Sequence, residues 1–400
     1  MSWLAIFALS FTILYIIDRA WKTAAIWHFF EQKPAPQPPQ KWPALSLIQP
    51  VTVSPNNLRA VLTVRAQLYY PGNLEQIVVC DAQDTASQAL CHELMEAFPS
   101  WKPKLVLAPA RPAVYAGLTA APGVALKTVK QLAGLELSTG QIVCFIDDDI
   151  ILRHNTLTTL VQYLLQPGIG AVFGLACYTN SRSAWSGLMS AFVNANALLN
   201  YIPLTYLSDP YTITGHLYAL KRTDFDSIGG LNGMEQRLDD DHELAQRVLQ
   251  AGLRNLQTPA IYNVDNELPS LNAFLAQMKR WFVFPRELML PRFPVRQQIL
   301  TFAASVPNLL PGLVFLLAFG GGLPAWLALA ACLLVFYMVY FWGERRILKE
   351  IAPARDWFLL LLVALVLPFQ IVFLLFSDNA ILWRGQRYRV ERGGHYEIIN

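Results

Sequence analysis

The hydrophobic positions divide the chain into apolar ends and an alternating middle. Residues 2–17, 299–319, 323–342 and 357–376 are almost wholly apolar, whereas residues 44–259 alternate short apolar runs with amphipathic stretches. Apolar runs of about 20 residues are typical of membrane helices. The alternating middle indicates strands and helices in βαβα order, which predicts a mainly parallel, doubly wound sheet.

Periodicity also predicts where the individual elements lie. The expected strands are 45–48, 76–80, 104–107, 142–146 and 170–176. The expected helices are 57–68, 88–98, 125–137, 155–165, 239–252 and 272–284.

Composition also indicates a membrane protein. Of the 400 residues, 54% are hydrophobic and only 15% are charged. The mean hydropathy of +0.33 is too high for one ordinary soluble domain. The net charge is +3 and no long basic run occurs, so we expect no nucleic-acid partner. The five cysteines contain no C-x-x-C pair, so neither a disulfide framework nor a zinc site is indicated.

The first apolar segment is expected to be a membrane helix rather than a cleaved signal peptide. It has no Lys or Arg in front of it, and Arg19, Lys22 and Lys33 follow it. By the positive-inside rule, the bulk of the chain then faces the cytoplasm.

The sequence leaves open on which side of the membrane the C-terminal tail lies. Both flanks of the apolar segment 357–376 are basic, the loop 343–356 and the tail after Ser377. Three full spans would place that tail outside, against the positive-inside rule. Proline residues such as Pro368 would permit a kinked or re-entrant piece instead.

Three consecutive carboxylates, Asp147, Asp148 and Asp149, stand where the expected strand 142–146 stops. Adjacent anions repel one another, so their clustering needs a cation or hydrogen-bond donors nearby. One Asp would be enough to cap the helix expected from Asn155. A D-x-D pattern at the carboxyl end of a strand therefore favours a hard divalent ion such as Mg²⁺ or Mn²⁺.

Further carboxylates occur at two other element ends. Asp81 and Asp84 follow the strand 76–80, and Asp239 to Asp241 open the helix 239–252. Capping and the helix dipole would account for one carboxylate at a helix start. A second triplet favours an acidic site over capping alone.

One helix combines amide, guanidinium and indole side chains on a single face. Gln277, Arg280 and Trp281 have helical i, i+3, i+4 spacing within 272–284. An amphipathic interfacial helix with an aromatic anchor and a snorkelling Arg would show the same pattern.

The acidic residues followed by Q-x-x-R-W resemble the membrane-bound inverting glycosyltransferases of family 2. Within that group, the closest resemblance is to ceramide glucosyltransferases and the hopanoid-associated bacterial glycosyltransferases of family 21. Lys127 followed by Gly134 is similar to the family's Lys-containing helix, and residues 383–388 are similar to its W-R-G-R-x-Y ending. Asp240 is a departure, because the family usually has Glu there. The resemblance covers nearly the whole chain.

This resemblance implies an α/β GT-A (Rossmann-like) glycosyltransferase domain with α-helical transmembrane segments. It implies inverting transfer of a hexose, with glucose expected, from a UDP-sugar to a hydroxyl of a membrane lipid such as ceramide. Mg²⁺ or Mn²⁺ is the implied cofactor, and the donor, the lipid acceptor and the bilayer are the implied partners.

The resemblance also implies roles for individual residues. The implied general base is Asp241 with Asp240 beside it, and the implied metal ligands are Asp149 and Asp147. The residues implied to bind the nucleotide sugar are Asp81, Asp84, Lys127, Asp147, Asp148 and Arg280. The residues implied to close the site around the acceptor are Gln277, Trp281 and His216.

The chain is therefore expected to have five parts. They are an N-terminal membrane helix with an interfacial extension (1–33), a Pro-rich linker (34–43), a cytoplasmic catalytic domain that includes Q-x-x-R-W (44–298), a C-terminal membrane region (299–376) and a basic tail (377–400).

Two other functions remain open at this point. A processive polysaccharide synthase would share the motifs, but it needs a translocation channel that is usually built from more membrane helices. A non-catalytic membrane scaffold or transporter is disfavoured, because the carboxylates cluster outside the apolar segments.

Overall fold

The computed structural model describes residues 2–51, 57–108, 125–235, 237, 239–383, 386–391 and 396–399. The chain divides into two compact units, and each is described by itself. The helical unit comprises residues 1–34, 177–208 and 266–385, and the sheet unit comprises residues 35–176, 209–265 and 386–400. Arg384 and Gly385 of the tail motif lie outside the described residues.

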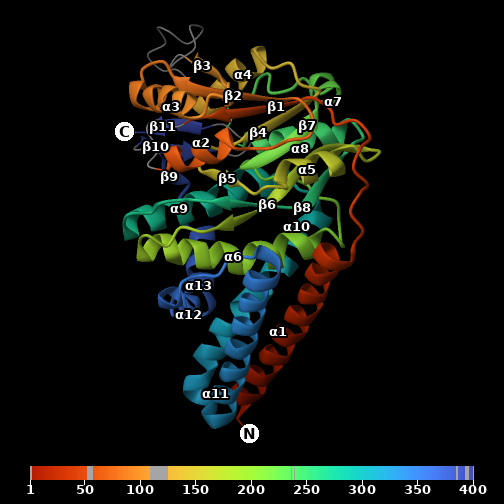
Figure 1. Ribbon diagram of the computed structural model, residues 1–400. Coiled ribbons are helices and arrows are strands. Elements are labelled where there is room, and N and C mark those ends of the chain that lie inside the picture. The colour runs from red at the N-terminus through yellow and green to blue at the C-terminus, as the bar shows by residue number, and fades with distance from the viewer. Residues whose placement is uncertain are drawn as a thin grey trace. The chain divides into compact units, whose positions relative to one another are not determined.

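An eight-stranded sheet forms the centre of the sheet unit (Figure 1). Its strand order is β3-β2-β1-β4-β7-β6-β8-β5. The strands are β1 Leu45–Pro50, β2 Leu74–Asp81, β3 Lys104–Ala108, β4 Ile142–Ile146, β5 Ile150–Leu152, β6 Ile169–Tyr178, β7 Leu217–Lys221 and β8 Arg254–Val264. A separate antiparallel pair is formed by β10 Gln386–Val390 and β11 Tyr396–Ile399.

The sheet is parallel in one half and mixed in the other. Strands β3, β2, β1 and β4 are parallel, as expected. Strand β7 is antiparallel to β4 and β6, and β5 is antiparallel to β8, so the prediction of a mainly parallel sheet is wrong for this half. Apolar runs carry no information about strand direction, and the chain leaves the sheet unit between β6 and β7.

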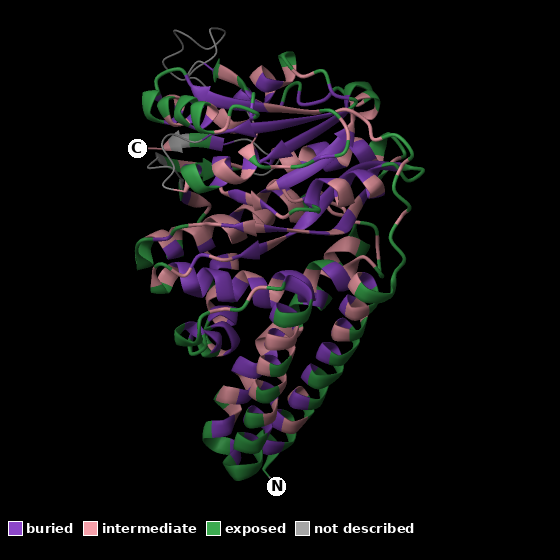
Figure 2. Cartoon of the chain, viewed as in Figure 1, coloured by how far each residue is buried: buried purple, intermediate pink, exposed green. Residues whose placement is uncertain are grey.

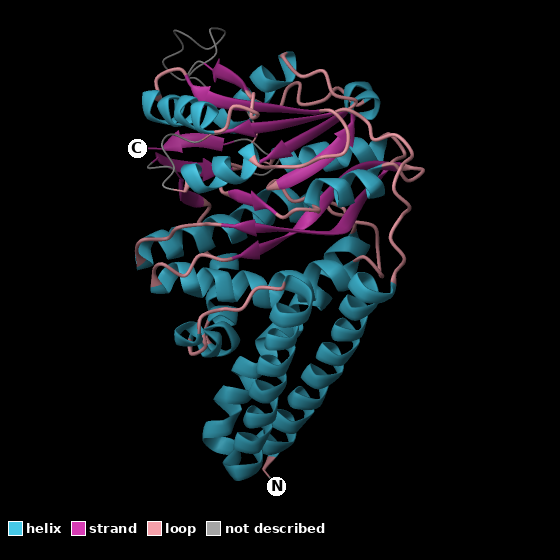
Figure 3. Cartoon of the chain, in the orientation of Figure 1, coloured by secondary structure: helices cyan, strands magenta, loops and turns pink. Residues whose placement is uncertain are grey.

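Helices cover both faces of the sheet (Figure 3). They are α2 Leu58–Ala66, α3 Thr85–Ala97, α4 Leu126–Glu136, α5 Thr156–Leu164, α7 Arg222–Ser227 and α8 Asp240–Gln250. Ile77 and Val79 of β2 pack in a core cluster with α4 and α8, whereas Val78 and Cys80 pack in another with α2 and α3. The alternation follows the two-residue period of a strand, and the central strands of the sheet are largely buried (Figure 2).

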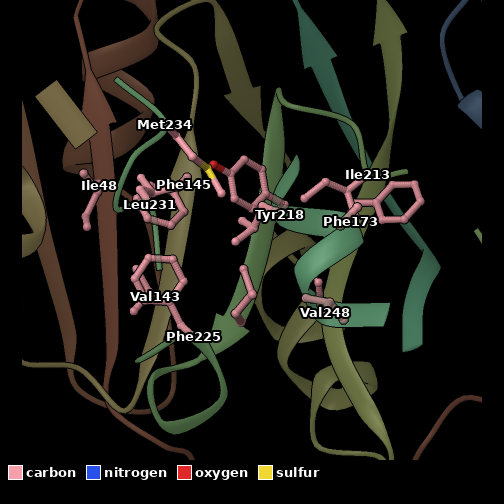
Figure 4. Packing of buried hydrophobic residues seen from close by; sticks show 14 of the residues in the cluster. Ile48, Val143, Phe145, Phe173, Ile213, Tyr218, Phe225, Leu231, Met234 and Val248 are labelled. Carbon is pink, nitrogen blue, oxygen red and sulfur yellow. The ribbon is translucent and has the colours of Figure 1, made fainter. Parts of the chain in front are cut away.

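The core cluster on the side of the sheet covered by α4 and α8 contains packed aromatic rings (Figure 4). Helix α4 also packs closely against this side. Phe145 of β4 lies 5.1 Å from the ring of Tyr218 and 5.8 Å from that of Phe225, measured between ring centroids. A Cβ at Gly134 would lie 2.6 Å from Ile48 Cγ2, so only glycine lets α4 approach β1 this closely. This approach positions the polar side chains at the start of α4.

The helical unit contains the long apolar helices. Its elements are α1 Trp3–Trp27, η1 His28–Gln32, α6 Ala184–Leu204, α9 Leu271–Phe284, η3 Pro285–Met289, η4 Leu290–Arg292, α10 Val295–Ser305, η5 Val306–Leu309, α11 Leu310–Trp342, η6 Gly343–Leu348, η7 Ala354–Asp356, α12 Leu359–Leu365, α13 Leu367–Leu375 and β9 Ala380–Trp383. Within the described chain, two helical stretches are long and apolar enough to cross a membrane, 3–32 and 295–348. The pair α12 and α13, bent by 45°, would make a third if it is one span.

The second of these stretches is interrupted at Gly322. Its φ of 67° and ψ of −165° are not helical, and glycine adopts them at low cost. Beside this break, a Cβ at Gly321 would lie 3.4 Å from the backbone nitrogen of Ala5. At the other end of the first half, Lys22 Nζ donates to the carbonyl of Ala304. The chain from α10 to Gly321 therefore runs antiparallel to α1.

After Gly322 the chain returns along α1. Thr12 Oγ1 donates to the carbonyl of Ala328, and Arg346 pairs with Glu31 at 3.3 Å. Residue numbers now rise together in both segments, so the second half of α11 is parallel to α1. Figure 1 shows the resulting helical hairpin beside α1.

Three charged side chains of α1 are buried against the start of this hairpin. Lys22 Nζ lies 3.1 Å from Asp18 Oδ1 and donates to the carbonyl of Ala304 at 2.8 Å. Arg19 donates to Asn308 Oδ1 at 2.7 Å. Charges in a membrane segment are costly unless paired, and here each one has a partner.

The two units divide the chain in another way than the five expected parts, whose boundaries stay a prediction. Residues 177–208 and 266–298 lie within the expected catalytic domain 44–298, yet they pack with the apolar helices. Helix α6 is apolar on nearly every face, and its apolar positions therefore show no amphipathic period that would reveal it.

Candidate active site

The acidic triplet lies in the turn between β4 and β5. The strand expected over 142–146 is confirmed as β4, and Ile150 begins β5, which pairs with the end of β8. The backbone nitrogen of Asp147 donates to the carbonyl of His216 at 2.9 Å, and the carbonyl of Asp149 accepts from the nitrogen of Asp265 at 3.0 Å. Backbone hydrogen bonds therefore fix the triplet at both ends.

Lys127, on the first turn of α4, binds this triplet. Its Nζ lies 2.7 Å from Asp147 Oδ1 and donates to the carbonyl of Gly215 at 2.9 Å. Burial opposes the charge of this ammonium group, but Asp147, Asp240 and Asp241 outweigh that effect and raise the pKa of Lys127 above its usual value.

The first turn of α8 brings two further carboxylates to the same place. A Cβ at Gly215 would lie 3.0 Å from Asp241 Oδ2, and Asp241 Oδ1 accepts from the backbone nitrogen of His242 at 2.7 Å. Burial, and then the neighbouring Asp240, raise the pKa of Asp241 to about 7. A helix N-terminus alone favours a fully ionised carboxylate near neutral pH. Here burial is the stronger effect, because Asp240 and Asp241 both lie in the enclosed first turn.

Asp149 has an oxygen that no described group satisfies. Its Oδ1 is buried and has no hydrogen-bond partner within the described part of the chain. Burial, followed by the charges of Asp147 and Asp148, raises the pKa of Asp149 to about 8. Asp148 lies half-buried between them. Buried carboxylates left unpaired are costly, so this oxygen is a place for a cation.

Asp81 and Asp84 lie at the end of β2, as expected, but they have different partners. Asp81 Oδ2 lies 2.9 Å from Lys130 Nζ, which also donates to the carbonyl of Val51 at 2.5 Å. Asp81 Oδ1 is buried without a partner among the described residues. Asp84 caps α3, because its Oδ1 accepts from the nitrogen of Ser87 at 3.1 Å.

Lys130 is the site residue that the sequence did not reveal. It stands one helical turn after Lys127 on α4, which places the two ammonium groups on the same face. This spacing of the two lysines was the feature of the sequence that could have indicated Lys130. A lone Lys on an amphipathic helix usually faces water, so burial against Asp81 becomes visible only in the folded chain.

His216 contributes through its backbone and packs through its ring. Its carbonyl accepts from Asp147, while the ring stands edge-on to Tyr262 with 6.3 Å between centroids. Its Nδ1 lies 3.5 Å from the Tyr262 hydroxyl, which is a weak contact.

Gln277, Arg280 and Trp281 belong to α9 in the helical unit, on the helix expected from sequence. Arg280 donates to Gln277 Oε1 at 3.0 Å. Trp281 stands perpendicular to Tyr178, with 6.0 Å between ring centroids. The three side chains thus form one polar and aromatic face of α9, on which the hydrogen bond to Gln277 fixes the orientation of the Arg280 guanidinium.

The sheet unit therefore brings together six of the expected residues. They are Lys127, Asp147, Asp148, Asp149, Asp240 and Asp241. Carboxylates outnumber the ammonium group, so this cluster suits a cation and the polar groups of a ligand. No group of three His, Cys, Asp or Glu side chains among the described residues forms a ready-made metal site. A metal held here would take its remaining ligands from phosphate and water, as Mg²⁺ commonly does.

Comparisons with known proteins give the family. No curated protein matches the chain. One solved structure that it resembles is a mannosyltransferase from Pyrobaculum calidifontis in complex with GDP-mannose and Mn²⁺. The identity is 18% and the TM-score 0.49, and the match covers 85% of this chain and 99% of that one. The model of glycosyl transferase family 21 matches residues 5–396. That match spans nearly the whole chain, and the chain therefore belongs to glycosyl transferase family 21.

Proposed function

We propose that the protein transfers a hexose, with glucose the first candidate, from a UDP-sugar to a hydroxyl group of a membrane lipid such as ceramide. The observation that carries this proposal is the meeting of Lys127 and Asp147 with Asp241 at Gly215. A cation-binding edge and a buried carboxylate with a pKa of about 7 are the two parts that inverting transfer needs.

Asp241 is the proposed general base. A base must be ionised to accept a proton, and a pKa near the working pH suits this task. Its carboxylate takes the proton of the acceptor hydroxyl while that oxygen bonds to the anomeric carbon. The bond from that carbon to the diphosphate breaks on the opposite face, so the configuration inverts. UDP leaves with the bonding electrons.

Asp147 and Asp149 are the proposed carboxylate ligands of Mg²⁺ or Mn²⁺. The buried and unsatisfied Oδ1 of Asp149 fits this role, since a bound cation would favour its charged form. When bound, a divalent ion neutralises the charge that grows on the leaving diphosphate. Lys127 holds Asp147 in place and adds a positive charge beside the same diphosphate.

The remaining assignments follow from chemistry. Asp81 keeps one oxygen, Oδ1, without a partner among the described residues, and this oxygen is proposed to accept hydrogen bonds from the uracil or ribose. Asp84 and Asp148 are the further residues proposed to bind the donor. Gln277, Arg280 and Trp281 are the proposed closure of the site, with the guanidinium toward diphosphate and the indole toward the acceptor. His216 is the proposed acceptor-side residue. The sheet unit is proposed to face the cytoplasm, because Lys33 follows the first helical stretch 3–32 and no Lys or Arg precedes it.

The test uses the purified full-length protein in lipid nanodiscs. It is supplied with single UDP-sugars, with Mg²⁺ or Mn²⁺, and with a panel of lipids that includes ceramide, and products are identified by mass spectrometry. The expected product is one hexose on one lipid. A polymeric product would indicate a synthase instead. Failure to consume any nucleotide sugar with any lipid would overturn the proposal.

A further inference from the structure

The bent pair α12 and α13 is the part of the helical unit whose path the apolar sequence leaves open. The two helices have 7 and 9 residues, roughly 10 and 13 Å at 1.5 Å per residue. Neither alone crosses a hydrocarbon core of about 30 Å. The contacts at the two ends of the pair therefore decide whether it crosses.

The chain that leads into α12 contacts the N-terminal end of α6. Arg355 donates to the carbonyl of Ser181 at 2.7 Å. A Cβ at Gly187, on the first turn of α6, would lie 3.1 Å from Asp356 Oδ2. The residues that precede α12 are thus held at the N-terminal end of α6.

The chain that follows α13 contacts the C-terminal end of α9. The guanidinium of Arg286, just after α9, donates to the carbonyls of Leu374, Leu375 and Ser377 at 3.2, 3.0 and 2.6 Å. The guanidinium thus caps the C-terminal end of α13, where the carbonyl of Leu374 also accepts from the backbone nitrogen and the hydroxyl of Ser377. Lys279 of α9 also pairs with Asp378.

Helices α6 and α9 form a single layer. The rings of Trp185 and Phe274 lie 6.2 Å apart and those of Phe192 and Phe282 lie 6.4 Å apart, measured between centroids. Ser183 also donates to the carbonyl of Leu268 at 2.6 Å. Entry and exit are therefore held by the same layer, whereas a span would place them about 30 Å apart in depth.

The bend reaches only part of the way along the hairpin. A Cβ at Gly312 would lie 2.6 Å from Phe369 Cε2 and 3.2 Å from the carbonyl of Leu365. Beyond that contact α11 continues from Gly312 to Gly322, roughly 15 Å at 1.5 Å per residue.

The surface of the pair identifies what covers it. Phe358, Val366, Phe373 and Phe376 expose between 51% and 85% of their surface. Residues 357–376 contain no charged side chain. Such a face fits hydrocarbon, and the pair is continuous with the apolar hairpin through its contact at Gly312.

We propose that residues 357–376 form a re-entrant element that enters and leaves one leaflet of the bilayer from the α6–α9 layer. Its partner is the acyl-chain region of that leaflet. Because the chain after the α11 hairpin also returns to η1, which follows α1 and contains Glu31, the tail after Ser377 lies on the same side of the membrane as the linker after η1. Both basic flanks of the segment then satisfy the positive-inside rule. This inference is independent of the sugar-transfer chemistry.

Single added cysteines in sealed vesicles, labelled with a membrane-impermeant maleimide, test the proposal in the full-length chain. The positions are exposed ones: Ser2→Cys before α1, Gln37→Cys in the linker and Glu391→Cys in the tail. The native cysteines are buried, and the unsubstituted chain sets the background. Position 391 is expected to label from the same side as position 37 and from the side opposite to position 2.

Labelling of position 391 from the same side as position 2 would overturn the proposal, because residues 357–376 would then span. A protease-cleavable tag added after Asn400 gives a second readout that changes no residue. Cleavage of this tag is expected only from the side that labels position 37, and cleavage only from the other side would contradict the re-entrant path.

Discussion

Two lysines one helical turn apart on α4 form ion pairs of opposite character. The interior pair, Lys130 and Asp81, leaves 5% and 9% of its side-chain surface exposed, and the site pair, Lys127 and Asp147, leaves 21% and 24%. Lys130 also donates to a backbone carbonyl, whereas Lys127 stands among additional carboxylates. The same residue types thus stabilise the fold at one end of a strand and form a charged site at the end of another.

The largest loss of activity is expected from substitution of Asp149, which stands beside the pair of Lys127 and Asp147. Asp149→Ala should abolish transfer in Mg²⁺ or Mn²⁺, because it removes the buried Oδ1 that has no hydrogen-bond partner among the described residues and is the proposed metal ligand. The exposed Asp226→Asn is the matched control and should leave turnover unchanged. Turnover is measured across a metal titration. Wild-type turnover of Asp149→Ala in either metal would refute the metal assignment.

The interior pair should dominate stability. Lys130→Met leaves the Asp81 carboxylate buried and uncompensated, which costs about 3–5 kcal/mol of unfolding free energy. Lys127→Met should cost about 1 kcal/mol or less, because the site pair retains access to water. Thermal unfolding of both variants in the same detergent measures the difference. Equal losses in Tm would mean that the two pairs do not differ as described.

Substitution of Asp241 tests whether this carboxylate, near the pair of Lys127 and Asp147, is the general base. Asp241→Asn keeps the size and the capping ability of the side chain, so folding and UDP binding should survive. Single-turnover transfer should fall by about a hundredfold or more, the usual scale for losing a general base. Asp240→Asn should cost less, and UDP binding by calorimetry is the control for both. An inactive Asp240→Asn beside an active Asp241→Asn would assign the base to Asp240.

The smallest effect expected is a shift in pH dependence. The raised pKa of Asp241 means that this carboxylate is protonated below about pH 7, so transfer should decline as the pH falls through that value. Asp240 is one cause of the raised pKa, and Asp240→Asn should therefore move the decline to lower pH. A pH–rate profile of Asp226→Asn should match that of the wild type.

Periodicity located most elements correctly, because amphipathic runs mark which face is buried. It found β2, β3, α4 and α9 to within a few residues. It did not reveal the direction of β7, since an apolar run reads the same either way. It correctly ended β4 before the three carboxylates, but it did not predict β5, which has only three residues and pairs with β8.

The site was only partly predictable for related reasons. The acidic residues stood out because repulsion makes their clustering costly without a ligand. The burial of Lys130 depends on the close approach of α4 to β1 at Gly134, which spacing alone does not show. The raised pKa of Asp241 likewise comes from enclosure by elements far apart in sequence.

The buried charges of α1 have a consequence for synthesis of the chain. The carbonyl that Lys22 binds belongs to a residue 282 positions later. At roughly 5–20 residues per second, that acceptor emerges about 15–60 s after Lys22. During this interval Asp18, one helical turn earlier, is the partner already available. Asp18 therefore compensates the charge of Lys22 within α1 until the segment that contains the carbonyl acceptor has been synthesised.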